Sequence, residues 1–280
     1  MVARFLAIVA VVVLVVGGSA YLAYELYWKP KALDAQEKKQ IELEKSLPPP
    51  PDPGVVAFDA LGEKLKSASP SEGKVLLEGF LAEFPKAPGV PEARRVLGTL
   101  NAREFFSPLP GEHKTPYSVV RGDALAKIAG KTKSNAELIY VVNDLQTINL
   151  QIGQELQIPE LDAQVTVNRA AKTLTVTNHG KFFKEYPVIG AVIPRLAEDA
   201  VLEATVLDKI ATVNGKRVAF GDKTYGESER VVLLTPGGGV LRTPPATETN
   251  EALPSGVLLS PEDFREVFVL VSRGTPVTIR

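Results

Sequence analysis

Few side chains in this 280-residue sequence could carry covalent or acid–base chemistry. The chain has no cysteine, which excludes thiol catalysis, disulfides, thiolate metal sites and a lipid-modified cysteine. Its two histidines are His113, in a linker where we expect it to be solvated, and His179, in a predicted hairpin turn. Ser255 is a candidate nucleophile, but an unassisted hydroxyl attacks poorly. No spacing of carboxylates or lysines indicates a catalytic pair, a metal site or a cofactor site.

Composition limits the partners that the chain can have. The formal net charge is -1, so no basic excess is present to attract nucleic acid. Hydrophobic residues make up 45% of the chain and charged residues 23%, which is enough for one or two ordinary cores with linkers.

The N-terminal segment, residues 1–28, predicts a membrane anchor. Residues 5–24 (FLAIVAVVVLVVGGSAYLAY) carry no charge, and about 20 helical residues match a hydrocarbon core about 30 Å thick. Tyrosines and Trp28 follow at the end where amphipathic rings favour the headgroup region. A cleaved signal peptide is the alternative, because Gly18–Ala20 offers small residues. Basic residues flank both ends, so their count does not decide the orientation.

Two helical segments are expected after the anchor. Residues 29–54 read as a charged helical stalk followed by a stiff proline-rich linker. Residues 55–107 show apolar residues at helical spacing in three segments, punctuated by Pro70 and Pro85. This module resembles a single tetratricopeptide-like hairpin. We favour a structural spacer over a peptide-binding module, because a single unit cannot form the groove that several stacked repeats build together.

Residues 116–159 predict a compact unit of strand, helix, helix and strand. A short strand at 117–120 leads to Gly122 and to Asp123, which is expected to cap the first helix. Apolar residues mark a second helix that ends near Asn143, and a strand returns at 154–158. The stretch YSVVRGDALAKIAG, with NLQIGQELQIP at the other end, closely resembles a LysM domain.

The LysM resemblance implies binding of N-acetylglucosamine polymers, which in bacteria means peptidoglycan. The implied groove lies between two loops, and its residues are Gly122, Asp123, Ala124 and Leu125 on one side and Ile148, Asn149, Leu150 and Ile152 on the other. Backbone groups would hydrogen-bond acetamido groups while aliphatic side chains pack against sugar faces. Ala124 stands where the family has Thr or Ser, so weaker binding is expected. The alternative is that Gly122 and Asp123 only form a turn and cap, and that Leu150 and Ile152 are core residues.

Residues 162–280 predict a mostly-β domain with one late helix. Strands are expected at 164–167, 173–177, 181–188, 202–211, 217–220, 230–235 and 240–243. A glycine turn at Gly256 precedes a helix at 261–271, for which Ser260 is the expected N-cap, and a closing strand follows.

The C-terminal segment resembles a YkuD-type L,D-transpeptidase domain whose chemical groups are missing. The family closes with S-H-G-C-I-R-L-S-N-E-D, a helix, then G-T-P-V-x-I, and Ser260, Glu262 and Asp263 set the register together with GTPVTI at 274–279. In this register, the positions of the family's catalytic Cys, neighbouring His and Arg are held by Gly256, Pro254 and Leu258. A further family His lies upstream in a short I-H-G-T strand, and the segment Val240–Thr243 resembles it with Arg242 in the His position. Without thiol and imidazole, the covalent step is absent.

The sequence therefore predicts an α+β multidomain protein with a transmembrane helix, a helical hairpin module, a βααβ LysM-like domain and an L,D-transpeptidase-like β domain. The expected function is non-catalytic binding of peptidoglycan at the cytoplasmic membrane, with the domains in the periplasm or wall space. A segment cut after Ala20 would instead release a secreted protein. Two alternatives remain: an active crosslinking enzyme that uses Ser255, and an envelope adaptor that binds another protein. No cofactor, metal or nucleic acid is expected.

Overall fold

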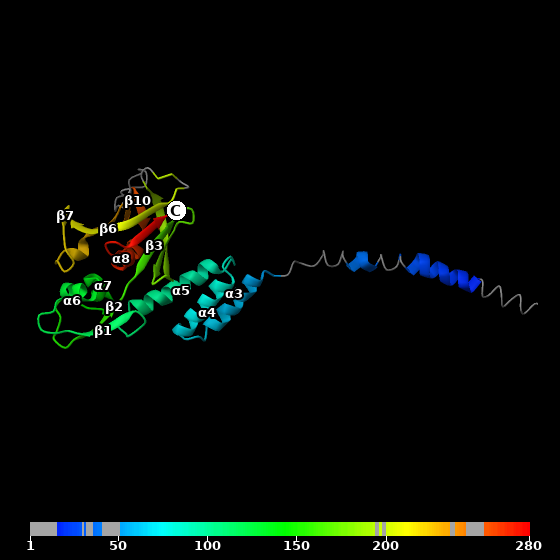
Figure 1. Cartoon of the computed structure of the whole chain (residues 1–280), viewed down its shortest axis with the longest axis horizontal. Helices are drawn as coiled ribbons and strands as arrows, with labels where there is room; N and C mark the ends of the chain where they lie inside the picture. The colour runs from blue at the N-terminus through cyan, green and yellow to red at the C-terminus, as the bar shows by residue number, and fades with distance from the viewer. Residues whose placement is uncertain are drawn as a thin grey trace, which may run out of the picture. The chain divides into compact units, whose positions relative to one another are not determined.

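The computed structural model describes residues 16–29, 31, 36–40, 51–193, 196–197, 200–235, 239–244 and 255–280 (Figure 1). Contacts divide the chain into two units, Met1–Pro53 and Gly54–Arg280. The three parts predicted after residue 54 thus belong to one compact unit. The domain boundaries within that unit stay predictions.

Most of the described residues of the first unit are helical. Residues 16–29, 31 and 36–40 are in helix, and Tyr24–Trp28 form a π-helical turn (η1). Most of the predicted span at 5–24, and all of the linker prolines at 48–50, lie outside the described residues. Among the residues that the structure describes, no helix has both the length and the apolar character needed to cross a membrane.

The predicted helical module is present as three helices. They are α3 (Pro53–Leu65), α4 (Pro70–Glu83) and α5 (Val90–Phe105). The α4 helix begins with a capping box, in which Ser69 accepts a hydrogen bond from the Glu72 backbone and the Glu72 carboxylate accepts one from the Ser69 backbone. A core of its own, centred on Leu77 and Leu97, holds the three helices together. The predicted helices are confirmed.

The βααβ order of the next segment is also confirmed. Its elements are β1 (Lys114–Ser118), α6 (Leu125–Thr132), α7 (Ala136–Val142) and β2 (Glu155–Pro159). The two strands pair antiparallel, and Ile128, Ile139 and Leu156 are buried in a second core between helices and sheet. Asn135 caps α7 by accepting a hydrogen bond from the Glu137 backbone.

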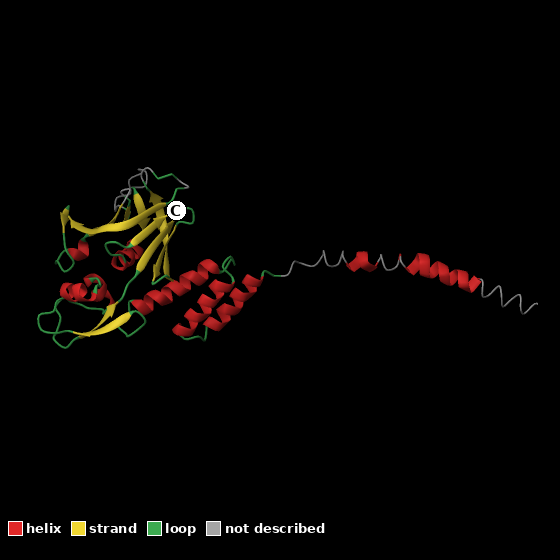
Figure 2. Cartoon of the chain, viewed as in Figure 1, coloured by secondary structure: helices red, strands yellow, loops and turns green. Residues whose placement is uncertain are grey.

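Strands dominate the C-terminal segment, as Figure 2 shows. They are β3 (Ala163–Asn168), β4 (Thr173–Asn178), β5 (Lys181–Val192), β6 (Leu202–Val213), β7 (Lys216–Arg217), β8 (Glu229–Thr235), β9 (Val240–Arg242), β10 (Gly256–Leu259) and β11 (Pro276–Ile279). In the described part of the chain they form one sheet in the order β11-β3-β4-β5-β10-β9-β8-β6-β7, and β11 also pairs with β6. The sheet therefore curves back on itself.

Two predictions for this sheet were wrong. The strand expected at 217–220 stops after Arg217, because the Asp222 carboxylate accepts a hydrogen bond from the Ala219 backbone and turns the chain. The turn expected at Gly256 is instead the start of β10, which pairs with β5 and β9. All four residues of β10 are buried, which fits a short continuous apolar run in the interior of a sheet.

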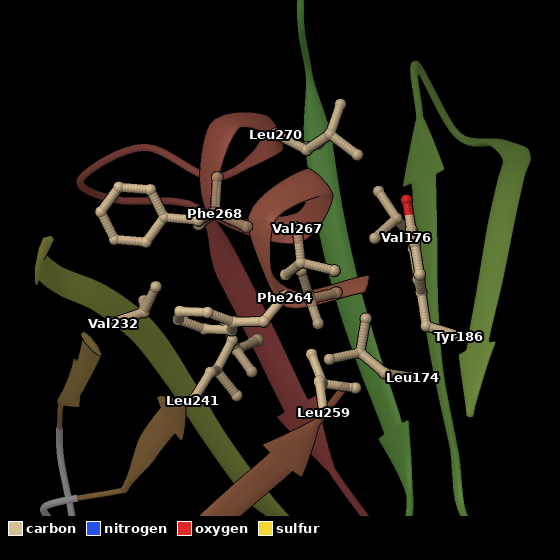
Figure 3. Packing of buried hydrophobic residues seen from close by; sticks show 14 of the residues in the cluster. Leu174, Val176, Tyr186, Val232, Leu241, Leu259, Phe264, Val267, Phe268 and Leu270 are labelled. Carbon is tan, nitrogen blue, oxygen red and sulfur yellow. The ribbon is translucent and has the colours of Figure 1, made fainter. Parts of the chain in front are cut away.

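One helix fills the space inside the curved sheet. It is α8 (Pro261–Leu270), and Ser260 caps it by accepting a hydrogen bond from the Asp263 backbone, as predicted. Figure 3 shows Phe264 and Val267 of α8 among side chains of the surrounding strands, and Phe268 belongs to the same core. A 3-10 turn, η2 (Tyr225–Glu227), precedes β8. The main core gathers around α8, and it also takes in residues of α5 and α7.

Candidate functional site

Backbone hydrogen bonds bring the two predicted glycan loops together. The Val119 amide donates to the Gln154 carbonyl at 2.9 Å, and the Gly153 amide donates to the Val119 carbonyl at 2.8 Å. These bonds continue the β1–β2 pairing beyond the ends of the strands, so Val119 lies beside Gly153 and Gln154. The two loops that carry the predicted groove residues therefore adjoin the same end of the small sheet.

Asp123 does not cap the first helix, contrary to the prediction. Ala124 occupies the N-cap position, whereas the Asp123 carboxylate accepts hydrogen bonds from the Tyr117 hydroxyl at 2.8 Å and the Val120 amide at 3.0 Å. Lys131 of α6 lies 2.7 Å from the same carboxylate, whose side chain is only 2% exposed. The hydrogen bond from Lys131, followed by those from Val120 and Tyr117, lowers the pKa of Asp123 to about 2. This carboxylate holds the loop to the strand and to α6.

The other predicted glycan residues divide into exposed and buried ones. Leu150 packs against the core of this segment, as the core interpretation expected, and Leu125, which was predicted for the glycan groove, is buried in the same core. Ile152 was open to the same interpretation, but its side chain is 72% exposed. Exposed on this face are Gly122, Ala124, Ile148, Asn149 and Ile152. Gly122 has a φ of +87°, a conformation that favours glycine.

The positions aligned with the transpeptidase motif meet on two neighbouring strands. Arg242 of β9 and Leu258 of β10 are register partners in a parallel pair, and Leu258 is fully buried. Gly256 has a φ of +125°, and a Cβ built there would lie 2.6 Å from Val240 Cγ2 and 2.9 Å from the Val240 carbonyl oxygen. The backbone at Gly256 thus leaves no room for a side chain. Pro254 lies outside the described residues.

The two imidazoles lie at the far end of β5 from β10. His179 adopts a φ of +48° in the turn that precedes β5, as predicted, and its ring stacks on His113 at 4.1 Å between centroids. The expectation that His113 is simply solvated was wrong. Gly256 pairs with Val192 at the other end of β5, and the 12 residues of β5 span roughly 36 Å at about 3.3 Å per residue. Neither histidine is therefore available to Ser255.

Sequence reasoning missed an ion pair that joins α7 to the β domain. Glu137 is buried, accepts a hydrogen bond from the Tyr225 hydroxyl at 2.8 Å, and pairs with Arg230 at 3.1 Å. The Arg230 guanidinium also lies over the Tyr225 ring, 4.5 Å from its centroid. These partners are separated by about 90 residues, and no spacing signal connects them.

Beside this ion pair lies an open cavity of about 850 Å³, lined by α7, the loop after it, the segment 220–226 and α8. Tyr140 and Tyr225 each contact Phe220 edge to face, with centroids 5.4 Å apart. Among the residues that the structure describes, no three His, Asp or Glu side chains gather in a way that could hold a metal ion.

Comparison with protein families identifies the segment that contains the predicted groove. Residues 117–159 match the LysM domain family. The segment forms the βααβ unit described above, with the two loops joined at Val119. No curated protein matches the chain.

Several solved L,D-transpeptidases resemble the chain at low identity. One from Mycobacterium smegmatis is 15% identical, with a TM-score of 0.31 over 46% of this chain and 64% of its own. One from Stackebrandtia nassauensis is 18% identical, with a TM-score of 0.30 over 42% of this chain and 55% of its own. L,D-transpeptidase 3 from Mycobacterium tuberculosis is 14% identical, with a TM-score of 0.31 over 60% of this chain and 92% of its own. The chain thus spans less than two thirds of the first two structures.

Proposed function

We propose that this protein binds N-acetylglucosamine-containing glycan, in the form of peptidoglycan, through the face made by loops 119–124 and 148–154. The observation that carries the proposal is the LysM match at 117–159. The hydrogen bonds of Val119 support it, because they join the two loops at the same end of the small sheet.

The chemistry of this face suits an acetylated sugar chain. Gly122 has no side chain and is exposed, which leaves backbone amide and carbonyl groups accessible to acetamido groups. Ile152 and Ile148 present aliphatic surface on which a sugar ring can pack. Asp123 would contribute indirectly, by holding the loop in place.

The protein would bind glycan without crosslinking it. The chain has no cysteine, and the position aligned with the nucleophile is Gly256, where the Val240 backbone blocks a side chain. Arg242 and Leu258 occupy two further positions that carry chemical groups in the transpeptidase motif. The β domain keeps the sequence GTPVTI at 274–279 but lacks the thiol and imidazole of the transpeptidase motif, so it is suited to a scaffolding role.

Attachment to the cytoplasmic membrane through residues 5–24 completes the proposal. These residues are uncharged in sequence and match the thickness of a bilayer. One LysM domain binds weakly, so tethering near the wall would raise its effective concentration there.

Retention of the full-length protein on purified cell walls tests this function. The double variant Asn149→Ala and Ile152→Glu removes two exposed groups of the face and leaves the Asp123 contacts intact. We expect about tenfold weaker binding, because one polar and one apolar contact are lost. The matched control is Val75→Glu, which changes an exposed residue of α4 and should bind normally. Equal retention of all three proteins would exclude this face.

A further inference from the structure

The open cavity between α7 and α8 has an aromatic wall to which both the LysM segment and the β domain contribute. Tyr140 of α7 lines it together with Phe220 and Tyr225 of the β domain. Phe220 lies between the two tyrosines and is only half-buried, so part of its surface remains accessible. The cavity volume of about 850 Å³ lies within the range of known small-molecule sites.

One loop connects this cavity with the proposed glycan face. Gln146, Thr147 and Ile148 line the cavity, and Ile148 and its neighbour Asn149 are exposed on the glycan face. Ile148 also approaches the β domain closely, because its Cδ1 would lie 3.3 Å from a Cβ built on Gly221. The loop therefore runs without a break from the glycan face to the β-domain side of the cavity.

The groups along this path suit a neutral ligand that carries hydroxyl groups and apolar faces. Gln146 and Thr147 are exposed, and their amide and hydroxyl groups both donate and accept hydrogen bonds. The buried carboxylate of the wall, Glu137, is neutralised by Arg230 at 3.1 Å. The exposed charges of the lining balance one another, since they are Asp222, Glu262, Lys223 and Arg265. A sugar ring has the matching chemistry, because its hydroxyl groups form hydrogen bonds while its C–H faces pack on aromatic rings.

We propose that this cavity is a second subsite for the same glycan chain, in which a sugar ring packs against Phe220 after the chain has passed Ile148. The inference rests on the proposed function, because its ligand is the glycan that the LysM segment would bind. The protein would bind long glycan chains more tightly than short ones, since only a long chain reaches both the two loops and the aromatic wall. The β domain would thus take part in glycan binding without any catalytic group.

Calorimetric titration of the full-length protein with chitobiose, chitotetraose and chitooctaose tests this subsite, because these neutral probes differ only in length. The variant Phe220→Leu removes the flat ring but keeps an apolar side chain against the core of the LysM segment, which Phe220 contacts. Phe220→Tyr keeps the ring. The matched control is Phe58→Leu, since Phe58 is a half-buried residue of α3 that does not line the cavity.

We expect the affinity of the unmodified protein to rise from chitobiose to chitooctaose. Phe220→Leu should bind chitooctaose about tenfold more weakly and chitobiose normally, whereas Phe220→Tyr and the control should match the unmodified protein.

Three outcomes would overturn the second subsite while the glycan proposal stands. They are equal affinity of Phe220→Leu and the control for chitooctaose, an equal loss in Phe220→Leu for chitobiose, and a loss in Phe220→Tyr as large as in Phe220→Leu. If the unmodified protein bound none of the three probes, the glycan proposal would fail and the second subsite with it.

Discussion

Asp123 shows how one carboxylate stabilises a loop that carries exposed residues of the proposed glycan face. Its side chain is nearly inaccessible, and three donors from the strand, the loop and α6 surround it. The exposed residues next to it, Gly122 and Ala124, therefore occupy fixed positions. In the proposed glycan face, the carboxylate would position the loop rather than contact the glycan.

Protonation of Asp123 is expected to destabilise the LysM segment in acid. Because the folded pKa is about 2 and the unfolded value 3.8, the stabilisation is complete above about pH 4 and is lost as pH falls toward 2. The free energy of unfolding can be measured by urea unfolding, followed by circular dichroism, at pH values across this range. It should fall less with decreasing pH in Asp123→Asn than in the unmodified protein. As control, Asp59→Asn on the exposed side of α3 should decline like the unmodified protein. A decline of the same size in Asp123→Asn would contradict this role.

Gly256 is a second residue whose role depends on backbone geometry. Restoring a cysteine in Gly256→Cys should not produce a transpeptidase, because the Cβ would overlap Val240 and the φ of +125° is strained for any side chain. We expect a loss of about 2–4 kcal/mol in the free energy of unfolding. Urea denaturation measures it, with Gly79→Ala as the control, since a Cβ there meets nothing within 4 Å. A variant as stable as the original, with crosslinking activity, would refute the pseudoenzyme proposal.

At the scale of elements, β6 carries a lysine against the helix that fills the sheet. The Lys209 ammonium lies 4.3 Å from the centroid of the Phe268 ring of α8. Desolvation lowers the pKa of Lys209 to about 8, although the Glu137 carboxylate opposes the shift. The folded protein therefore disfavours the charged form of this side chain.

Lys209 should make the protein more stable as pH rises from about 8 to 10.5. In this window the unfolded state binds more protons than the folded state, so raising the pH favours folding, by about 3 kcal/mol in total. The variant Lys209→Met should lack this rise and be more stable than the original at pH 7. Chemical denaturation at a series of pH values measures both effects. If the free energy of unfolding changed with pH in the same way for both proteins, the lowered pKa of Lys209 would be contradicted.

At the scale of the whole molecule, the LysM segment contributes to two cores. Ile139 of α7 is buried in the core of the LysM segment, whereas its neighbour Leu138 is buried in the main core of the β domain. Asn101 of α5 similarly donates hydrogen bonds to the Phe182 and Phe183 carbonyls of β5. The three parts of Gly54–Arg280 are therefore coupled, and deletion of the LysM segment would also expose part of the β core.

The variants Leu138→Ala and Ile139→Ala test this coupling as a matched pair. Each substitution should lower the free energy of unfolding by about 2–5 kcal/mol, because each leaves a cavity in a core. Hydrogen exchange should distinguish them, with amides of α8 exchanging faster in Leu138→Ala, and amides of α6 and β2 exchanging faster in Ile139→Ala. Identical exchange patterns in the two variants would show that α7 does not link separate cores.

Local patterns in the sequence determined the elements and the LysM segment. Helical spacing of apolar residues, the Ser260 cap and alternation in the strands act between near neighbours, so a linear reading finds them. The two loops of the proposed glycan face were also found from motif positions. The same reading missed β10, because its four residues are buried on both faces and show no alternation.

Tertiary structure alone decided which of these residues meet across the chain. The ion pair of Glu137 with Arg230, the stack of His113 on His179 and the aromatic wall of the cavity join residues more than 60 positions apart. In the structure, Asp123 accepts a hydrogen bond from Tyr117 of β1 instead of capping a helix, and Val240 leaves no room for a side chain at Gly256. Such contacts depend on how whole elements pack, and short-range patterns in the sequence carry no information about that packing.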